Sequence, residues 1–264
     1  MFRLTPAVKT LLIINVVVFL LPQLLRLQDF FGDTFALYYI QGDMFKPWQF
    51  ITYMFLHADF SHLFHNMLGL FVFGPLLEDV VGTRKFYAFY LIVGLGAGIL
   101  FMGTEYLEKR DLEQSVDLFL QEPNAEEYEV LVSTEFAEQY DVLAPLVDGY
   151  RKNPASEQYK SEAVNSVYIL FDRYLNSAMV GASGAVFGIL LAVGLLFPFR
   201  QIYLLFIPFP IRIRLLVIFF AATEIYSIIQ ARPNDPVAHI AHLGGMLVGY
   251  LVLLNWGIAR NRYQ

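Results

Sequence analysis

Apolar residues in this 264-residue chain gather into long runs that carry few charges. A helix that crosses a bilayer needs about 20 mainly apolar residues. Six runs approach this length, at approximately 8–27, 61–81, 86–103, 177–198, 210–230 and 236–256. The pattern therefore predicts an all-α fold, a polytopic membrane protein whose six transmembrane helices form a bundle.

The composition agrees with a membrane protein. Hydrophobic residues make up 57% of the chain and its mean hydropathy is +0.51, whereas soluble domains are about 45–50% apolar. The absence of cysteine excludes a disulfide, a thiolate nucleophile and a cysteine metal site. No basic nucleic-acid patch or phosphate loop is visible, so we expect no nucleic-acid partner and no cofactor.

Residues 104–175 differ from the rest of the chain. They hold sixteen Asp/Glu against six Lys/Arg, a net charge of −10. Apolar residues recur there at helical spacing, at Leu107, Leu112, Val116 and Phe119. Two prolines, Pro123 and Pro154, break the segment into pieces. We predict a soluble helical insertion between spans three and four, although a solvated acidic loop would have the same composition. The predicted divisions are 1–103 (spans one to three), 104–175 (insertion) and 176–264 (spans four to six).

The distribution of Lys and Arg predicts the orientation of the spans, because cytoplasmic loops carry an excess of both. The acidic insertion falls on one side of a six-span arrangement, and most Lys and Arg residues fall on the other. The latter are Arg3, Lys9, Arg84, Lys85, Arg200, Arg212, Arg214, Arg260 and Arg262. We therefore expect both termini in the cytoplasm, the insertion outside, and the protein in the cell (inner) membrane as a multi-pass protein.

Polar residues near the starts of spans two, four and six point to one shared site. His62 and Asn66 lie in span two, Ser183 in span four and His242 in span six. All three spans run from outside to inside, and Ser183 and His242 lie about six residues, or roughly 9 Å, below the outer boundary. Polar groups inside a bilayer are costly and usually mark a functional site facing the bundle interior.

Small residues allow spans four and six to approach each other. Gly245 and Gly249 lie on the same helix face as His242, and span four offers Gly184 and Gly188. Small residues four apart let membrane helices pack closely, although such spacing is also common in ordinary packing. A close contact would bring His242 toward Ser183.

These residues could perform acyl transfer. A serine hydroxyl becomes a nucleophile when a base such as histidine takes its proton. His62, Asn66 and the Ser183 backbone N–H could donate hydrogen bonds to an oxyanion, and Phe187 could pack against the His242 ring. No Asp or Glu is expected near His242 at this depth, so the sequence predicts a Ser–His dyad without an acidic third member.

At these residues the chain resembles the rhomboid intramembrane serine proteases. Residues 62–66 (HLFHN) are similar to the family's H-x-x-x-N, 181–184 (GASG) to its G-x-S-G, and 241–249 (AHLGGMLVG) to its A-H-x-x-G-x-x-x-G. The stretch from Pro47-Trp48 to His57, with Gly74-Pro75 and Glu78, also resembles the family. The resemblance covers 1–103 and 176–264.

The resemblance implies roles for individual residues. Ser183 would be the nucleophile and His242 the base, because His242 and not His239 is followed by Gly245 and Gly249 at the family's spacing. The oxyanion donors would be His62, Asn66 and the Ser183 amide, with Gly181, Gly184 and Phe187 in support. Span five and the 231–235 loop would form a gate that admits a substrate helix. The implied partners are single-pass membrane-protein substrates and the lipid bilayer.

Two other functions remain open at this stage. The chain could be a non-catalytic rhomboid-like binder of transmembrane helices, although inactive relatives typically lack the Ser or the His. It could also be a metal site or metal transporter built on the pairs His62/His65 and His239/His242, but no carboxylate ligand is evident nearby and no metal is expected. His65, His239 and the intramembrane Glu224 have no assigned role.

Overall fold

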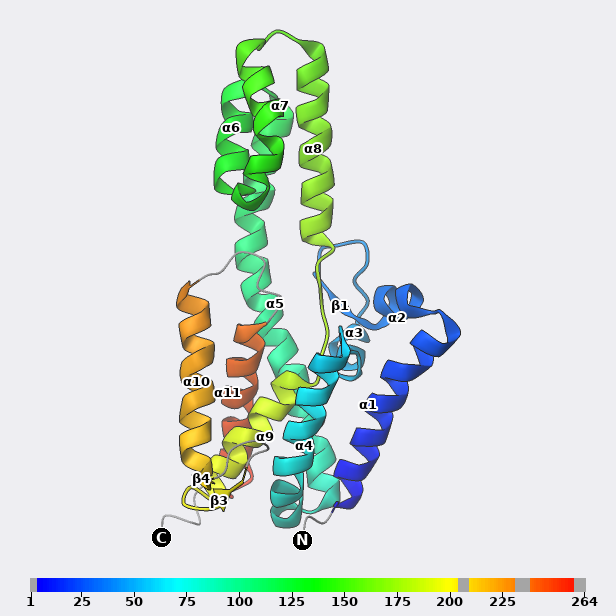
Figure 1. Ribbon diagram of the computed structural model, residues 1–264, viewed down its shortest axis with the longest axis vertical. Coiled ribbons are helices and arrows are strands. Elements are labelled where there is room, and N and C mark those ends of the chain that lie inside the picture. The colour runs from blue at the N-terminus through cyan, green and yellow to red at the C-terminus, as the bar shows by residue number, and fades with distance from the viewer. Residues whose placement is uncertain (1–3, 204–208, 231–237, 259–264) are drawn as a thin grey trace. The chain divides into compact units, whose positions relative to one another are not determined.

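We describe a computed structural model of the chain, which covers residues 4–203, 209–230 and 238–258 (Figure 1). The described residues are mainly helical. Two compact units divide the chain: the first comprises residues 1–37, 45–102 and 178–264, and the second comprises residues 38–44 and 103–177. Each unit is described by itself.

The first unit holds the apolar helices. Its elements are α1 (Pro6–Leu25), α2 (Gln28–Phe35), α3 (Gln49–Thr52), the short 3₁₀ helix η1 (Tyr53–Phe55), α4 (Phe60–Val81), the first part of α5 (Thr83–Gln121), α9 (Ser183–Leu196), α10 (Ile213–Gln230) and α11 (His239–Asn255). The strands β3 (Gln201–Ile202) and β4 (Ile211–Arg212) pair antiparallel between α9 and α10. Two further two-residue strands, β1 (Leu37–Tyr38) and β2 (Ala178–Met179), also pair with each other.

Helix α9 occupies the middle of the first unit. It packs against α4 on one side and against α11 and α10 on the other, while α1 packs against α4 (Figure 1). Nearly all of its side chains are buried or half-buried. A helix that is apolar all round belongs in the interior of a bundle, where it contacts other helices on every face.

Within the described residues, four helices are long and apolar enough to cross a membrane by length and composition, namely α1, α4, α5 and α10. Helices α9 and α11 are apolar but shorter. With 14 residues, α9 is about 21 Å long at 1.5 Å per residue, less than the roughly 30 Å of a hydrocarbon core. The count of six spans therefore remains a prediction.

The limits of three helices differ from those of the predicted spans three, four and six. Helix α5 does not end near residue 103 but continues to Gln121. Span four was expected from residue 177, whereas residues 178–179 form β2 and the helix begins at Ser183. Helix α11 begins at His239 rather than near 236. Ser183 is thus the first residue of its helix and His242 the fourth, so neither lies six residues inside its helix.

The second unit has its own hydrophobic core. It contains the end of α5, α6 (Ala125–Thr134), the 3₁₀ helix η2 (Ala137–Gln139), α7 (Tyr140–Lys152) and α8 (Glu157–Leu175). Asn124 caps α6 by accepting a hydrogen bond from Glu127 N at 2.9 Å. The core residues include Leu112, Val116, Phe119, Tyr128, Val132, Tyr150 and Val167. A segment that packs such a core is more than an acidic loop.

Two details of this unit were not expected. Leu107, placed on the apolar face by its spacing, is 59% exposed. Lys109 is buried. Its Nζ donates hydrogen bonds to the Tyr174 carbonyl at 2.9 Å and to Ser177 Oγ at 3.0 Å. The same atom forms an ion pair with Glu105 at 2.8 Å and lies 4.9 Å from the centre of the Tyr39 ring. This lysine ties residues 38–44 to the helical segment, because a buried ammonium requires partners on all sides.

Candidate active site

Ser183 and His242 are in hydrogen-bond contact. The hydroxyl oxygen of Ser183, at the start of α9, lies 2.8 Å from Nε2 of His242 on α11. The two residues are 59 positions apart in sequence, so the contact depends on how the two helices pack. At this distance a neutral imidazole can accept the hydroxyl proton.

Glycines set the separation of these helices. A side-chain carbon at Gly188 would lie 2.8 Å from the Gly245 carbonyl oxygen, and one at Gly249 would lie 3.1 Å from the Gly188 Cα. At Gly184 an added carbon would meet the Ala97 side chain and the Ala241 carbonyl. Helices α9 and α11 therefore touch backbone to backbone, and this brings Ser183 within reach of His242.

The turn before Ser183 requires glycine. Gly181 has φ +127°, a conformation that L-residues rarely adopt, and its N–H donates to the Tyr53 carbonyl at 2.9 Å. A side-chain carbon there would lie 2.7 Å from His62 Cε1 and Nε2 and 3.6 Å from Ser183 Oγ. The His62 ring and the Ser183 hydroxyl thus face the same small space beside Gly181.

Helix α4 brings His62 and Asn66 to this space. Asp59 begins the helix by accepting a hydrogen bond from His62 N at 2.8 Å. Asn66 is buried, and its Nδ2 donates to the His62 carbonyl at 3.1 Å. An amide NH₂ group has two hydrogens, so one of them remains for another acceptor.

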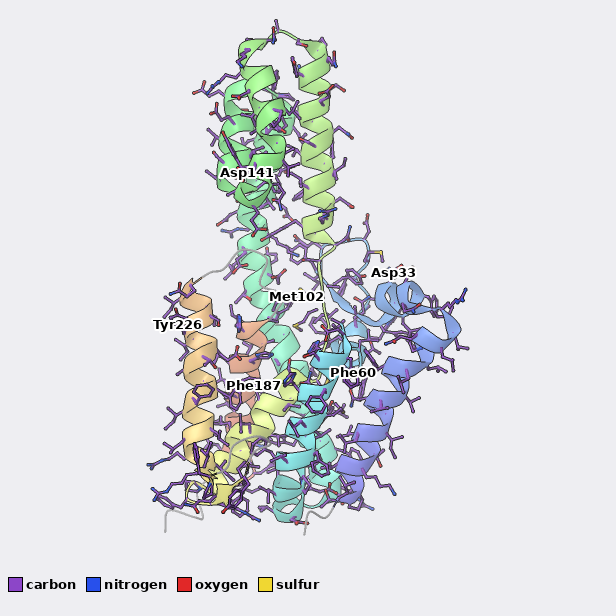
Figure 2. The ribbon with its side chains drawn as sticks, viewed as in Figure 1. Asp33, Phe60, Met102, Asp141, Phe187 and Tyr226 are labelled. Carbon is purple, nitrogen blue, oxygen red and sulfur yellow. The ribbon has the colours of Figure 1, made fainter. Side chains whose placement is uncertain are left out.

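Phe187 holds one face of the His242 ring. The two rings are stacked, with centres 4.2 Å apart and planes 8° from parallel. Phe187 lies one turn after Ser183 on α9, among the helices of the first unit (Figure 2). A ring held on one face has less freedom to rotate, so this contact restricts the imidazole to orientations near Ser183.

The structure corrects the expectation that no acidic residue lies near His242. Glu224 on α10 is only 7% exposed, and its Oε2 lies 3.1 Å from His242 Nδ1 and 2.5 Å from His239 Nδ1. Sequence spacing could not place this carboxylate, because α10 and α11 are separate helices. The signal that could have found it was the presence of an acidic residue inside an apolar helix.

Glu224, His239 and His242 could also hold a metal ion. Their potential ligand atoms all lie within 4.8 Å of one another. This set differs from the expected pairs. His62 packs beside Gly181, and His65 Nδ1 contacts its own helix at the Ser61 carbonyl oxygen, 2.7 Å away.

His57 lies in the loop before α4. Its ring centre is 5.1 Å from that of His62, with the planes 72° apart. Burial lowers the pKa of His57 to about 4, and the neighbouring His62 contributes in the same direction. His57 is therefore neutral at neutral pH and supports the His62 ring by packing. The 231–235 loop, expected as part of a gate, lies outside the described residues.

Comparison with known proteins identifies the family. The model of the rhomboid domain matches residues 44–111 and 162–257, more than half of the chain. This chain belongs to the rhomboid family. The matched ranges include α4, α9, α10 and α11, and therefore all of the residues of the candidate active site. As a rhomboid with several apolar helices, it is a multi-pass membrane protein.

Individual relatives match over short segments. The Rhomboid protease AarA of Providencia stuartii is 38% identical over 61 residues, which are 23% of this chain and 22% of that protein. Rhomboid-like protein 11, chloroplastic, of Arabidopsis thaliana is 39% identical over 57 residues, 21% of this chain and 20% of the relative. RHOMBOID-like protein 2 of the same plant is 43% identical over 55 residues, 21% and 17% of the two chains. The matches thus span less than a quarter of these relatives.

Proposed function

We propose that this rhomboid is an intramembrane serine endopeptidase that hydrolyses a peptide bond in or near the transmembrane segment of single-pass membrane proteins. The observation that carries the proposal is the 2.8 Å distance from Ser183 Oγ to His242 Nε2. The name of the Providencia relative, a rhomboid protease, supports the same activity.

The reaction begins with attack by Ser183 on the substrate carbonyl carbon. The Ser183 Oγ–H proton moves to His242 Nε2 as the Oγ–C bond forms and the carbonyl oxygen takes up the electron pair. The tetrahedral intermediate then collapses: the C–N bond breaks, and His242 returns its proton to the leaving amine. Water, deprotonated by His242, then attacks the carbonyl carbon of the Ser183 ester; the C–Oγ bond breaks, and His242 returns the proton to Ser183 Oγ.

The developing oxyanion needs hydrogen-bond donors that are already in place. The His62 ring beside Gly181, the second Asn66 amide hydrogen and the Ser183 backbone N–H are our candidates. The N–H groups of a first helical turn have no partner within the helix, so the Ser183 amide at the start of α9 is suited to this role. Gly181 leaves room for the substrate carbonyl.

The membrane arrangement is also part of the proposal. Six spans, with α9 and α11 as the short fourth and sixth, would place both termini in the cytoplasm of a cell (inner) membrane protein and the site near the extracytoplasmic face. Under this arrangement the acidic segment at 104–175 would be a soluble extracytoplasmic insertion. Arg3, Arg260 and Arg262, which support this orientation, lie outside the described residues.

Cleavage of a model transmembrane substrate in proteoliposomes tests the proposal. Wild type should cleave it and label with a fluorophosphonate probe, and Ser183→Ala should do neither. His242→Ala should also be inactive. Leu24→Ala is the control, because Leu24 is 80% exposed on α1 and its replacement should leave cleavage unchanged. Cleavage by Ser183→Ala at the wild-type rate would refute the proposal.

A non-catalytic binder of transmembrane helices is the alternative within the family. It would bind the same substrate with no probe labelling in the wild type. A metal-dependent activity is the other alternative, supported by the cluster of Glu224, His239 and His242. It predicts that chelator abolishes activity and that Ser183→Ala does not.

A further inference from the structure

Glu224 is a buried acidic residue of α10. The other buried residues of the described helix are Ile213 and Leu216, whereas most of its apolar side chains are exposed. Tyr226, two positions later, is 56% exposed (Figure 2). An ionisable side chain inside a membrane bundle is costly and needs a partner, so the helix is turned to direct Glu224 toward α11.

The partners of Glu224 are the two histidines of α11. Its Oε2 lies 2.5 Å from His239 Nδ1 and 3.1 Å from His242 Nδ1. Nδ1 of His242 is buried and has no hydrogen bond of standard geometry among the described residues. At 3.1 Å, the Glu224 carboxylate is close enough to Nδ1 to accept its hydrogen.

The tautomer of His242 links this contact to catalysis. Nε2 must carry a lone pair to accept the Ser183 proton, so the hydrogen of the neutral ring must be on Nδ1. A carboxylate beside Nδ1 favours that tautomer and stabilises the imidazolium that forms during attack. Glu224 is the carboxylate in that position.

We infer that Glu224 is a positioning residue that converts the Ser183–His242 pair into a Ser–His–Glu triad, with His239 holding the carboxylate in place. Glu224 stays ionised throughout, while the proton moves only between Ser183, His242 and the leaving group. The inference rests on the proposed protease function and adds to it an acidic third member on a separate helix.

The hydrogen-bond distances favour this arrangement over a metal centre. His239 Nδ1 and Glu224 Oε2 are within hydrogen-bond distance, whereas two ligands of one metal ion direct their lone pairs at the ion and not at each other. Among the residues that the structure describes, His62 on α4 also faces the site, and it lies on the Gly181 side of Ser183.

Kinetics of variants in proteoliposomes test the inference. Glu224→Ala and Glu224→Gln should lower kcat about 10- to 100-fold, the range of a hydrogen bond to a charged group, with KM changed less than threefold. Fluorophosphonate labelling of Ser183, measured per folded protein, should slow by a similar factor. Glu224→Asp should restore part of the loss. His239→Ala should remain active, with kcat lowered less than tenfold, because Glu224 keeps its contact with His242 in that variant.

Thr223→Val is the matched control. Thr223 is the neighbour of Glu224, and its hydroxyl donates to the Phe220 carbonyl of its own helix, so the variant should keep the wild-type kcat and labelling rate. A Glu224→Gln enzyme with wild-type kcat and labelling, alongside an inactive Ser183→Ala, would overturn the triad while leaving the protease proposal intact. Cleavage by Ser183→Ala would instead refute the protease itself.

Two further measurements need no Glu224 variant. ¹⁵N-edited proton NMR of the wild type should show a far-downfield resonance from His242 Nδ1–H, and its absence would overturn the inference even if Glu224→Gln failed to fold. Treatment of the wild type with EDTA should leave kcat unchanged. Loss of activity with EDTA and its recovery with Zn²⁺ would assign the cluster to a metal and also overturn the triad.

Discussion

Gly245 of α11 and Gly184 of α9 lie so close that a side-chain carbon at Gly245 would overlap the Gly184 backbone carbonyl. This contact determines how near His242 can come to Ser183, because Ser183 and Gly184 both lie on α9 while His242 and Gly245 both lie on α11. Backbone atoms cannot move aside as a flexible side chain can, so any residue larger than glycine forces the helices apart.

We expect Gly245→Ala to lower both stability and activity. Overpacking of this kind costs about 1–3 kcal/mol, and separation of α9 from α11 lengthens the Ser183–His242 distance, so kcat should fall at least tenfold. Thermal unfolding in detergent and cleavage assays measure the two effects. Gly103→Ala is the control: no atom lies within 4 Å of the added carbon, and alanine favours a helix. Equal activity of the two variants would contradict the packing argument.

We expect Gly181→Ala to act mainly on catalysis. The added carbon would push against the His62 ring 2.7 Å away, and the backbone at φ +127° would be strained by about 1–3 kcal/mol. Cleavage should fall more than tenfold. Gly82→Ala separates the two causes, since Gly82 has φ +80° in open space and should lose stability but not kcat. A Gly181→Ala enzyme with normal kcat would show that His62 does not contribute.

We expect Phe187→Leu to lower kcat about 2- to 10-fold and Phe187→Tyr to preserve it. The tyrosine ring can maintain the stack on His242, whereas leucine lets the imidazole rotate. Aromatic pairs contribute about 0.5–1.5 kcal/mol beyond the area they bury, which corresponds to a loss of this size. Rates of fluorophosphonate labelling report the effect on Ser183 without contribution from substrate binding. Identical rates for the leucine and tyrosine variants would exclude a role for stacking.

His57 should make the folded state sensitive to acid. Because burial holds its pKa near 4 against an ordinary 6.5, the unfolded chain binds a proton first as the pH falls. The contribution of neutral His57 to the free energy of unfolding is therefore fully present above pH 6.5. It is lost as the pH falls toward 4, by at most about 3 kcal/mol. Thermal unfolding of wild type and His57→Gln between pH 7 and pH 4.5 should show a shallower slope for the variant. Parallel curves would disprove this assignment.

Hydropathy alone predicted the long apolar helices. The runs at 8–27, 61–81 and 210–230 correspond to α1, α4 and α10 within a few residues, because helices in a membrane protein follow long apolar stretches. The ends of α5, α9 and α11 were less accurate. Helix α5 continues into polar sequence, where its later turns pack into the core of the second unit, and α9 begins late because Gly181 and β2 hold the preceding residues in non-helical conformations.

The sequence by itself determined the family, the helical class and the identities of Ser183, His242, His62 and Asn66 as candidates, since these depend on local composition and on motifs within single helices. Only the tertiary structure decided that Glu224 faces the two histidines and that Phe187 stacks on His242. The rotation of a helix about its own axis is set by packing against helices distant in sequence. The acidic side chain in α10 could therefore acquire a place beside His242 only once the bundle was assembled.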